Sequence, residues 1–246
     1  MHHVVVLIAE RQGGTCTNQS LSLLLSVMCL LSKVWDANKR DLRLVQEVRE
    51  HSKAVTCLYI PPSRDKLYSG SLDKTIRVWI VKPEGIHCIQ VHDVKESVHG
   101  LTADANFAYF FSQGAGVKVF GWSGVTKHIN FKQSVKCIDM IGDKLYCGCS
   151  GFSILETDLQ KTSTTTFYSG TRKLLGKQSI NSICIHDDLL YTGGTSVDGT
   201  AGKVLKSRAA NEQTFSEPFM NRSAGSSFVF SPLLNELTRT KFRLFS

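Results

Sequence analysis

"KLYSGSLDKTIRVW", residues 66–79, joins two extended runs through a short polar turn. In its second half Ile76 and Val78 fall on one side of the chain, and Arg77 and Trp79 fall on the other. This period of two is typical of a β-strand. Small and turn-forming residues separate the two runs, as the connection of a hairpin requires. The stretch therefore predicts a β-hairpin that ends in a tryptophan.

The first segment of this hairpin is repeated along the chain. "KLYSGS" is echoed by "KLYCGC" at 144–149 and "LLYTGG" at 189–194, with "FAYFFS" at 107–112 as a degenerate copy. Spacings of 41, 37 and 45 residues separate the aligned tyrosines Tyr68, Tyr109, Tyr146 and Tyr191. Several short strands within a period of about 40 residues indicate a β-propeller blade. Helical repeats are disfavoured because the segments are short, β-branched and interrupted by glycine and aspartate.

An apolar run precedes each of these phrases and carries a small residue at one equivalent position, followed by leucine or isoleucine. The small residues are Cys57, Gly100, Cys137 and Ser182. This regularity predicts close backbone packing at one recurring place. It also explains two of the eight cysteines as small core residues. Because the chain is too long for a disulfide-stapled scaffold, we expect its cysteines to be reduced and mostly buried.

Residues 51–79 resemble a WD-repeat. In that family a histidine, a serine or threonine, an aspartate and a tryptophan form a buried hydrogen-bonded network within the blade. The matching residues here are His51, Ser69 or Ser71, Asp73 and Trp79. The resemblance implies a structural role for them. A Ser-His-Asp catalytic triad is the rival interpretation, which is disfavoured because the chain lacks a G-x-S-x-G turn.

The sequence thus predicts an all-β chain that forms a WD40 β-propeller with irregular N- and C-terminal segments. The expected repeat region is 32–205, between an unplaced segment 1–31 and a disordered, non-repeat tail 206–246. Blade units are expected near 33–46, 51–91, 95–131, 134–167 and 179–205. A propeller is stable when its ring closes, typically with 4–8 blades. The four to five recognisable units lie at the lower end of this range. The sequence therefore predicts an incomplete propeller, and a chain that is a fragment or isoform of a longer protein.

The sequence of residues 33–204 has features that are more specific than those of a generic propeller. Its longest phrase, "FYSGTRKLLGKQSINSICIHDDLLYTGGTSVDGTAGKV" at 167–204, resembles the C-terminal WD-repeat region of plant U-box ubiquitin ligases of the Cerberus, or LIN, type. The resemblance implies a propeller that recruits substrates or partners for protein ubiquitination, with a role in root symbiosis and nodulation. No U-box segment is found in this chain. We therefore expect no catalytic residues here, and whether the chain acts as an enzyme stays open.

The partner surface is expected on exposed loops, which vary most in a propeller. Candidates are the loop Pro61–Asp65 and the insertion Tyr168–Gln178, whose basic residues are Arg172, Lys173 and Lys177. A generic WD40 scaffold unrelated to ubiquitin is one alternative. A nucleic-acid-binding propeller that uses the net charge of +8 is another. The second is disfavoured because no aromatic residue interleaves the basic loop.

The sequence shows no recognisable motif for a cofactor, a metal ion or a membrane span. "GTRKLLGKQ" at 170–178 lacks the spacing and the serine or threonine of a phosphate-binding loop. Cys147 and Cys149 have no second pair with which to hold zinc. No apolar run reaches the ~18–20 residues of a membrane span, and residues 21–31 lack the flanks of a signal peptide. We expect no cofactor, no metal and no membrane partner, and a location inside the cell in the cytoplasm or nucleus.

Overall fold

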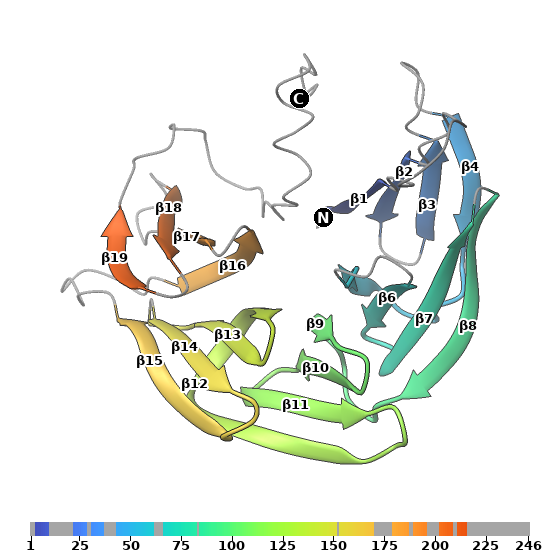
Figure 1. Cartoon of the computed structure of the whole chain (residues 1–246). Coiled ribbons are helices and arrows are strands. Elements are labelled where there is room, and N and C mark those ends of the chain that lie inside the picture. The colour runs from blue at the N-terminus through green and yellow to red at the C-terminus, as the bar shows by residue number, and fades with distance from the viewer. Residues whose placement is uncertain are drawn as a thin grey trace, which may run out of the picture. The chain divides into compact units, whose positions relative to one another are not determined.

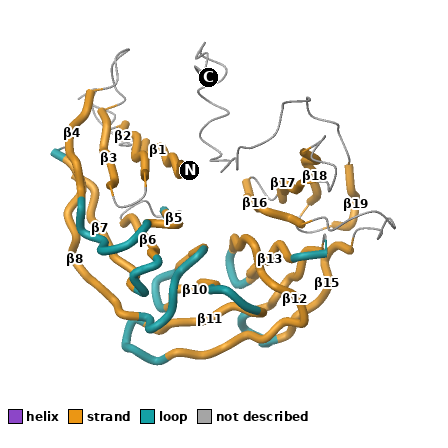
Figure 2. The backbone as a smooth tube through the Cα atoms, turned by 180° about the vertical axis from the view of Figure 1, so that it is seen from behind, coloured by secondary structure: helices purple, strands orange, loops and turns teal. Residues whose placement is uncertain are grey.

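The described part of the chain consists of β-strands. The computed structural model describes residues 3–9, 22–28, 31–36, 43–61, 66–82, 84–151, 153–169, 179–186, 189–195, 202–208 and 211–215. Within these ranges nineteen strands are found and no helix (Figures 1 and 2). The prediction of an all-β chain is therefore confirmed. Among the same residues, none belongs to an apolar helix that could cross a membrane.

The first sheet is antiparallel and has four strands. In order these are β1 (His3–Ala9), β2 (Ser22–Met28), β3 (Leu31–Asp36) and β4 (Arg43–Val48). Both β1 and β2 lie in the segment 1–31, for which no blade was predicted from the sequence. Their runs "HVVVLIA" and "SLLLSVM" are almost continuously apolar. Such runs do not by themselves distinguish a strand from a buried helix, so pairing with β3 decides their structure.

The second sheet contains the quoted hairpin. Its strands are β5 (Val55–Tyr59), β6 (Lys66–Ser71), β7 (Thr75–Lys82) and β8 (Gly85–Asp93), in that order. The predicted hairpin is β6 and β7, and Leu67 lies directly opposite Trp79 in its register. Its turn contains Lys74 with a φ of 72°.

Both faces of this second sheet are buried. On one face Ile76 and Val78 pack with Val98 and Phe110. On the other, Trp79 packs with residues of the first sheet and of its own sheet, namely Val34, Val48, Leu67 and Ile86. The alternating pattern of β7 thus supplies apolar side chains to two separate cores. This explains why both sides of the strand carry large apolar residues.

The next strands form a continuous series. They are β9 (Gly100–Ala103), β10 (Phe107–Phe111), β11 (Ala115–Gly121), β12 (Thr126–Ile141), β13 (Lys144–Cys149), β14 (Ser153–Asp158) and β15 (Ser163–Ser169). The second half of β12, from Val135 to Ile141, pairs with β13. Its first half lies against β11, where Gly116 contacts the backbone of Ile129 and Asn130. One long strand therefore belongs to two successive hairpins.

The last described sheet has the order β16 (Ser179–His186), β17 (Leu189–Thr195), β18 (Gly202–Arg208) and β19 (Asn211–Phe215). The sequence-based boundary at residue 205 falls inside β18, and β19 lies beyond it. Neither β18 nor β19 contains the repeated tyrosine-glycine motif. Their positions in the sheet therefore follow from the pairing of β18 with β17 and of β19 with β18. Residues 216–246 lie outside the described residues.

The chain divides into two compact units. The first holds β1 to β10 together with residues 120–125, and the second holds residues 113–119 with β12 to β19. Tyr146, Ile154, Ile180 and Leu190 form a core cluster of the second unit. Both units therefore have a core of their own.

In three of the repeats a glycine lies directly opposite the small residue predicted in the first strand. The opposed pairs are Cys57 with Gly70, Cys137 with Gly148, and Ser182 with Gly193. A fourth pair reverses the sizes, because Gly100 lies opposite Phe111. Each pair thus combines one residue without a side chain and one with a side chain.

These glycines allow the segment that follows each sheet in the chain to pack closely against the glycine backbone. A Cβ atom added to Gly148 would lie 2.5 Å from the Sγ of Cys137 and 2.7 Å from the Cγ2 of Ile180. A Cβ at Gly70 would lie 2.7 Å from the Sγ of Cys57 and closer still to Val98. Real Cβ atoms do not come this close to other atoms. The predicted close backbone packing at a recurring place is therefore confirmed.

The hydroxyl of Thr102 in β9 is fully buried and has no hydrogen-bond partner among the described residues. Replacing Thr102 by valine keeps the shape and removes the orphaned hydroxyl. We expect the free energy of unfolding to rise by about 1 kcal/mol, measured by urea denaturation. Thr157→Val is the matched control, because the buried Thr157 hydroxyl bonds to that of Thr164 at 2.9 Å. The control should lose stability, and a loss in both variants would contradict the prediction.

A largely buried carboxylate connects β12 to β16. The Oδ2 of Asp139 accepts the N–H of Ile185 at 2.8 Å, and its Oδ1 accepts the N–H of Met140 at 2.9 Å. Burial outweighs these hydrogen bonds and raises the pKa of Asp139 to about 6. The folded state therefore binds a proton more readily than the unfolded state. The stability that this proton contributes is present below the unfolded pKa near 4 and is lost as the pH rises to 6.

Asp139→Asn should remove this pH dependence. Relative to the parent protein, the stability of the variant is expected to increase by about 1–2 kcal/mol between pH 4 and pH 6, and then to level off. The range is below the full linkage value because the side chain keeps some contact with solvent. Denaturant unfolding of both proteins at pH 4, 5, 6 and 7 measures the difference. A difference that is constant over this range would contradict the assignment.

Candidate functional site

Four separate parts of the second sheet supply the predicted polar network. His51 precedes β5, Ser69 lies in β6, Asp73 lies in the β6–β7 turn, and Trp79 lies in β7. The antiparallel pairing of β6 and β7 brings the turn and the tryptophan to the serine strand. The structure thus brings these four residues together.

The four side chains form one hydrogen-bonded chain. Trp79 Nε1 donates to Ser69 Oγ at 2.9 Å, Ser69 Oγ lies 2.7 Å from His51 Nε2, and His51 Nδ1 lies 2.8 Å from Asp73 Oδ2. An indole N–H can only donate and a carboxylate can only accept. The Ser69 hydroxyl and the His51 imidazole, which lie between them, must therefore each accept one hydrogen bond and donate the next in the same direction. The serine hydroxyl donates to Nε2, and a neutral histidine donates from Nδ1, so each group in the chain has a partner.

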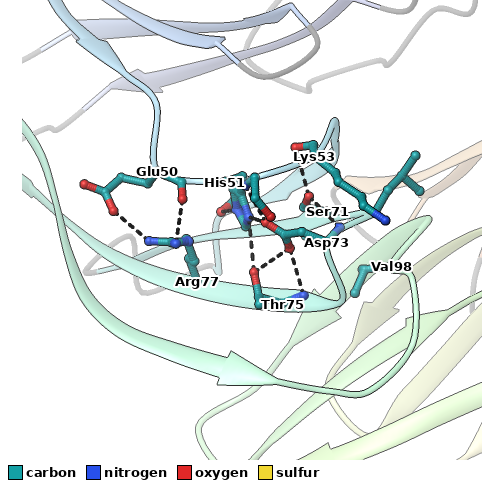
Figure 3. A network of polar contacts seen from close by, with 12 residues as sticks. Glu50, His51, Lys53, Ser71, Asp73, Thr75, Arg77 and Val98 are labelled. Carbon is teal, nitrogen blue, oxygen red and sulfur yellow. Dashed lines mark hydrogen bonds and ion pairs between the residues drawn. The ribbon is translucent and has the colours of Figure 1, made fainter.

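Asp73 also organises the turn (Figure 3). Its Oδ1 accepts hydrogen bonds from the backbone N–H and the hydroxyl of Thr75, at 3.0 and 2.6 Å. Its Oδ2 accepts the N–H of Ser52 at 3.0 Å. Ser71 Oγ accepts the N–H of Asp73 and donates to the carbonyl of Lys53, both at 3.1 Å. Of the two predicted serines, Ser69 belongs to the network and Ser71 holds the turn.

A second contact fixes the segment that carries His51 (Figure 3). The guanidinium of Arg77 donates to Glu50 Oε2 at 2.8 Å and to the Glu50 carbonyl at 2.6 Å. The roles of Arg77, Glu50 and Thr75 were not predicted from the sequence. Arg77 lies two residues before Trp79 and shares its face of β7, which is the signal that could have indicated it.

The charge state of the network follows from burial and hydrogen bonding. Burial alone would raise the pKa of Asp73, but the hydrogen bonds from Thr75 and His51 outweigh it and lower the pKa to about 2. Burial also lowers the pKa of His51, although Asp73 acts in the opposite direction. At neutral pH the histidine is therefore neutral and the aspartate is charged. The stability from both groups is retained at neutral pH and is lost as the pH falls.

The order serine, histidine, aspartate is also that of a catalytic triad. Here, however, Ser69 is 3% exposed and its oxygen accepts the indole N–H of Trp79. A substrate carbonyl has no access to a nucleophile that is buried in this way. The arrangement can hold the loop and the turn of the blade in place, and it offers no route for acyl transfer.

The corresponding place in the sheet of β13 and β14 has a different composition. There Leu145 lies opposite Thr157, as Leu67 lies opposite Trp79, and Cys147 stands at the position of Ser69. Burial raises the pKa of the Cys147 thiol well above its ordinary value. This blade therefore has Cys147 and Thr157 where the other has Ser69 and Trp79, and it lacks the tryptophan network.

The predicted partner loops lie mostly outside the described residues. Arg172, Lys173 and Lys177 all do, and of the loop Pro61–Asp65 only Pro61 is described. Their role stays a prediction. Six cysteines of the described residues are free thiols. The same part of the chain contains no group of three or more histidine, cysteine or acidic side chains arranged to hold a metal ion.

Comparison with known proteins agrees with this geometry. The family described as WD domain, G-beta repeat, matches residues 42–79, which include the whole network. The solved WD40 repeats of RRP9 superpose with a TM-score of 0.60 and 16% identity, covering 85% of this chain and 64% of that one. The structure of U3-55K gives the same TM-score and identity, with 89% and 71% covered. At this identity the likeness shows the fold, a WD40 β-propeller.

Closer relatives are found among plant proteins named as E3 ubiquitin-protein ligases. LIN of Medicago truncatula is 62% identical over 173 residues, and LIN-1 of Lotus japonicus is 59% identical over 173 residues. LIN-2 of Lotus japonicus is 58% identical over 174 residues. Each match covers 70–71% of this chain and 12% of the relative. The chain thus spans a small part of the length of these relatives. It is a WD40-repeat protein, homologous along most of its length to one region of the LIN-type ubiquitin ligases of plants.

Proposed function

We propose that this chain is a protein-interaction module that recruits a substrate or partner to a plant ubiquitin ligase of the LIN type. The observation that carries the proposal is the 62% identity over 173 residues to a protein named as such a ligase. WD40 propellers in general mediate contacts between proteins, which supports a recruiting role. We further propose that the module acts inside the cell, in the cytoplasm or nucleus, and contributes to ubiquitination during root symbiosis and nodulation.

The chemistry of the described residues supports recruitment over catalysis. The one serine-histidine-aspartate arrangement among them is buried and fully engaged in hydrogen bonds. That network holds the loop and the turn of one blade in place, and the glycine contacts pack neighbouring strands closely, which suits a scaffold that presents loops to a partner. In this proposal ubiquitin transfer takes place on a U-box that is separate from residues 1–246.

A fusion experiment tests the proposal. The chain is joined to the active U-box of an unrelated ligase and incubated with root extract, tagged ubiquitin, activating enzyme and conjugating enzyme. We expect a defined set of proteins to become ubiquitinated by this fusion and to remain unmodified when the same U-box carries an unrelated propeller. Identical protein sets for the two fusions would contradict the proposal. Ubiquitin transfer by residues 1–246 alone would contradict it as well.

A further inference from the structure

The first half of β12, residues 126–134, is a strand with a free edge. It lies against β11 on one side, while β13 pairs only with residues 135–141. Among the described residues, no other strand of this sheet adjoins its second side. The side chains of Lys127, His128 and Lys132 are exposed on this strand. The backbone N–H and C=O groups of such an edge can pair with an added strand.

This edge belongs to a stretch of the chain without acidic residues. No aspartate or glutamate occurs between Asp104 and Asp139, whereas Lys127, Lys132 and Lys136 are exposed there. Within the described ranges, these lysines take part in none of the ion pairs, which involve other residues. The positive charge of the edge is therefore not balanced by neighbouring carboxylates in the strand.

Lysines on an edge can also serve to prevent unwanted pairing between strands. Two other edge strands of the described residues do not follow that pattern. The edge strand β8 contains no lysine between Gly85 and Asp93 and exposes Ile89 and Val91, which are 48% and 52% accessible. The edge strand β15 has the sequence "STTTFYS", also without lysine. Since lysine is not used to protect these two edges, its concentration on β12 points to recognition.

We propose that the free edge of β12 at residues 126–134 binds an acidic polypeptide segment by strand addition, with Lys127 and Lys132 facing its carboxylates. An extended strand advances about 3.3 Å per residue, so these two lysines are separated by roughly 17 Å. Because successive side chains of a strand alternate between its two faces, the odd spacing places Lys127 and Lys132 on opposite faces, so the partner segment needs acidic residues on both of its own faces. The inference rests on the proposed function as a protein-interaction module, and it specifies the chemistry of the partner.

Nucleic acid is the other polyanion that this charge could attract. Binding of single strands normally uses exposed aromatic rings on which the bases stack. On this edge the aromatic residue is Phe131, which is partly buried, and the basic residues are lysines and a histidine without arginine. These features favour a peptide. A single-stranded oligonucleotide is therefore included below as a competing ligand.

The test measures binding to residues 1–246 by fluorescence anisotropy. The probe is a labelled ten-residue peptide in which pairs of glutamates alternate with pairs of threonines, so that an extended strand carries carboxylates on both faces. The double variant Lys127→Glu/Lys132→Glu should weaken its binding at least tenfold. The control Arg49→Glu/Lys53→Glu reverses the same charge at exposed positions of the first unit and should change the affinity less than twofold. Circular dichroism melting establishes that both variants are folded, as expected for exposed positions.

Two further probes separate charge from strand addition. Methylating alternate backbone nitrogens of the peptide should abolish binding, because it removes the donors that pair with the edge. A peptide with glutamine in place of glutamate should bind at least tenfold more weakly. Equal losses in the two double variants, unaffected binding of the methylated peptide, tighter binding of a ten-nucleotide DNA strand, or no peptide binding would each overturn the inference. The fusion experiment, repeated with Lys127→Glu/Lys132→Glu, distinguishes a failure of this inference from a failure of the proposed function. Unchanged ubiquitination by that variant would overturn only the role of this edge.

Discussion

Replacing Ser69 by alanine is expected to lower the free energy of unfolding by about 3–4 kcal/mol. The substitution removes one hydroxyl and leaves two buried groups without a partner, His51 Nε2 and Trp79 Nε1. Each buried polar group that is left without a partner costs about 1–3 kcal/mol, which is more than the packing lost with one oxygen atom. Urea denaturation followed by circular dichroism measures the effect. Ser163→Ala is the control, since Ser163 is exposed on an edge strand, and should change stability by less than about 0.5 kcal/mol.

A double-mutant cycle identifies the cause of this loss. In the background of Trp79→Phe the indole donor is already absent, so Ser69→Ala leaves only one buried group unpaired. The cost of the serine change should then fall by about 1 kcal/mol or more. Additive effects of the two substitutions would show that the serine and the tryptophan are energetically independent. That result would contradict the one-directional hydrogen-bond chain derived from the geometry.

Gly148→Ala is expected to lower the free energy of unfolding by about 2–3 kcal/mol, although alanine is normally better than glycine in a strand. The new methyl group would overlap the Sγ of Cys137 and the Cγ2 of Ile180, at 2.5 and 2.7 Å. Both atoms belong to packed strands that cannot easily withdraw. Thermal and urea unfolding measure the loss. Gly121→Ala is the matched control, because the nearest atom there is 3.4 Å away, and should be close to neutral.

Removal of the opposing side chain should partly reverse this effect. Cys137→Ala takes away the sulfur that the new methyl group meets, while Ile180 remains. The double variant with Gly148→Ala should therefore be less destabilised than the sum of the two single variants. The pair Gly100 and Phe111 shows that the reversed arrangement of sizes is compatible with the same register. Strict additivity would contradict the packing argument.

Much of the central part of the fold follows from local pattern. The hairpin of β6 and β7 has the period of two, a turn with aspartate and glycine nearby, and a tryptophan at a defined distance. These signals are short-range, so they can be interpreted from one segment. The recurring small residue opposite glycine is also visible in the sequence, because it repeats with the tyrosine phrase.

The strands at both ends could not be placed in this way. The runs of β1 and β2 are almost uniformly apolar, and β18 and β19 are largely polar. A strand with a clear alternation shows which face is buried, whereas a uniform run does not. Their membership in a sheet depends on partners that are distant in sequence.

The sequence alone determined the class of fold and the repeat, because both follow from short-range spacing and residue type, and its resemblance to a WD-repeat indicated His51, Asp73, Trp79 and one of two serines. Only the tertiary structure decided which serine joins Trp79 to His51 and how Arg77 holds the histidine segment. It also decided that β12 has an unpaired basic edge. Hydrogen-bond direction, burial and strand edges depend on which distant segments come together, and local sequence does not specify that.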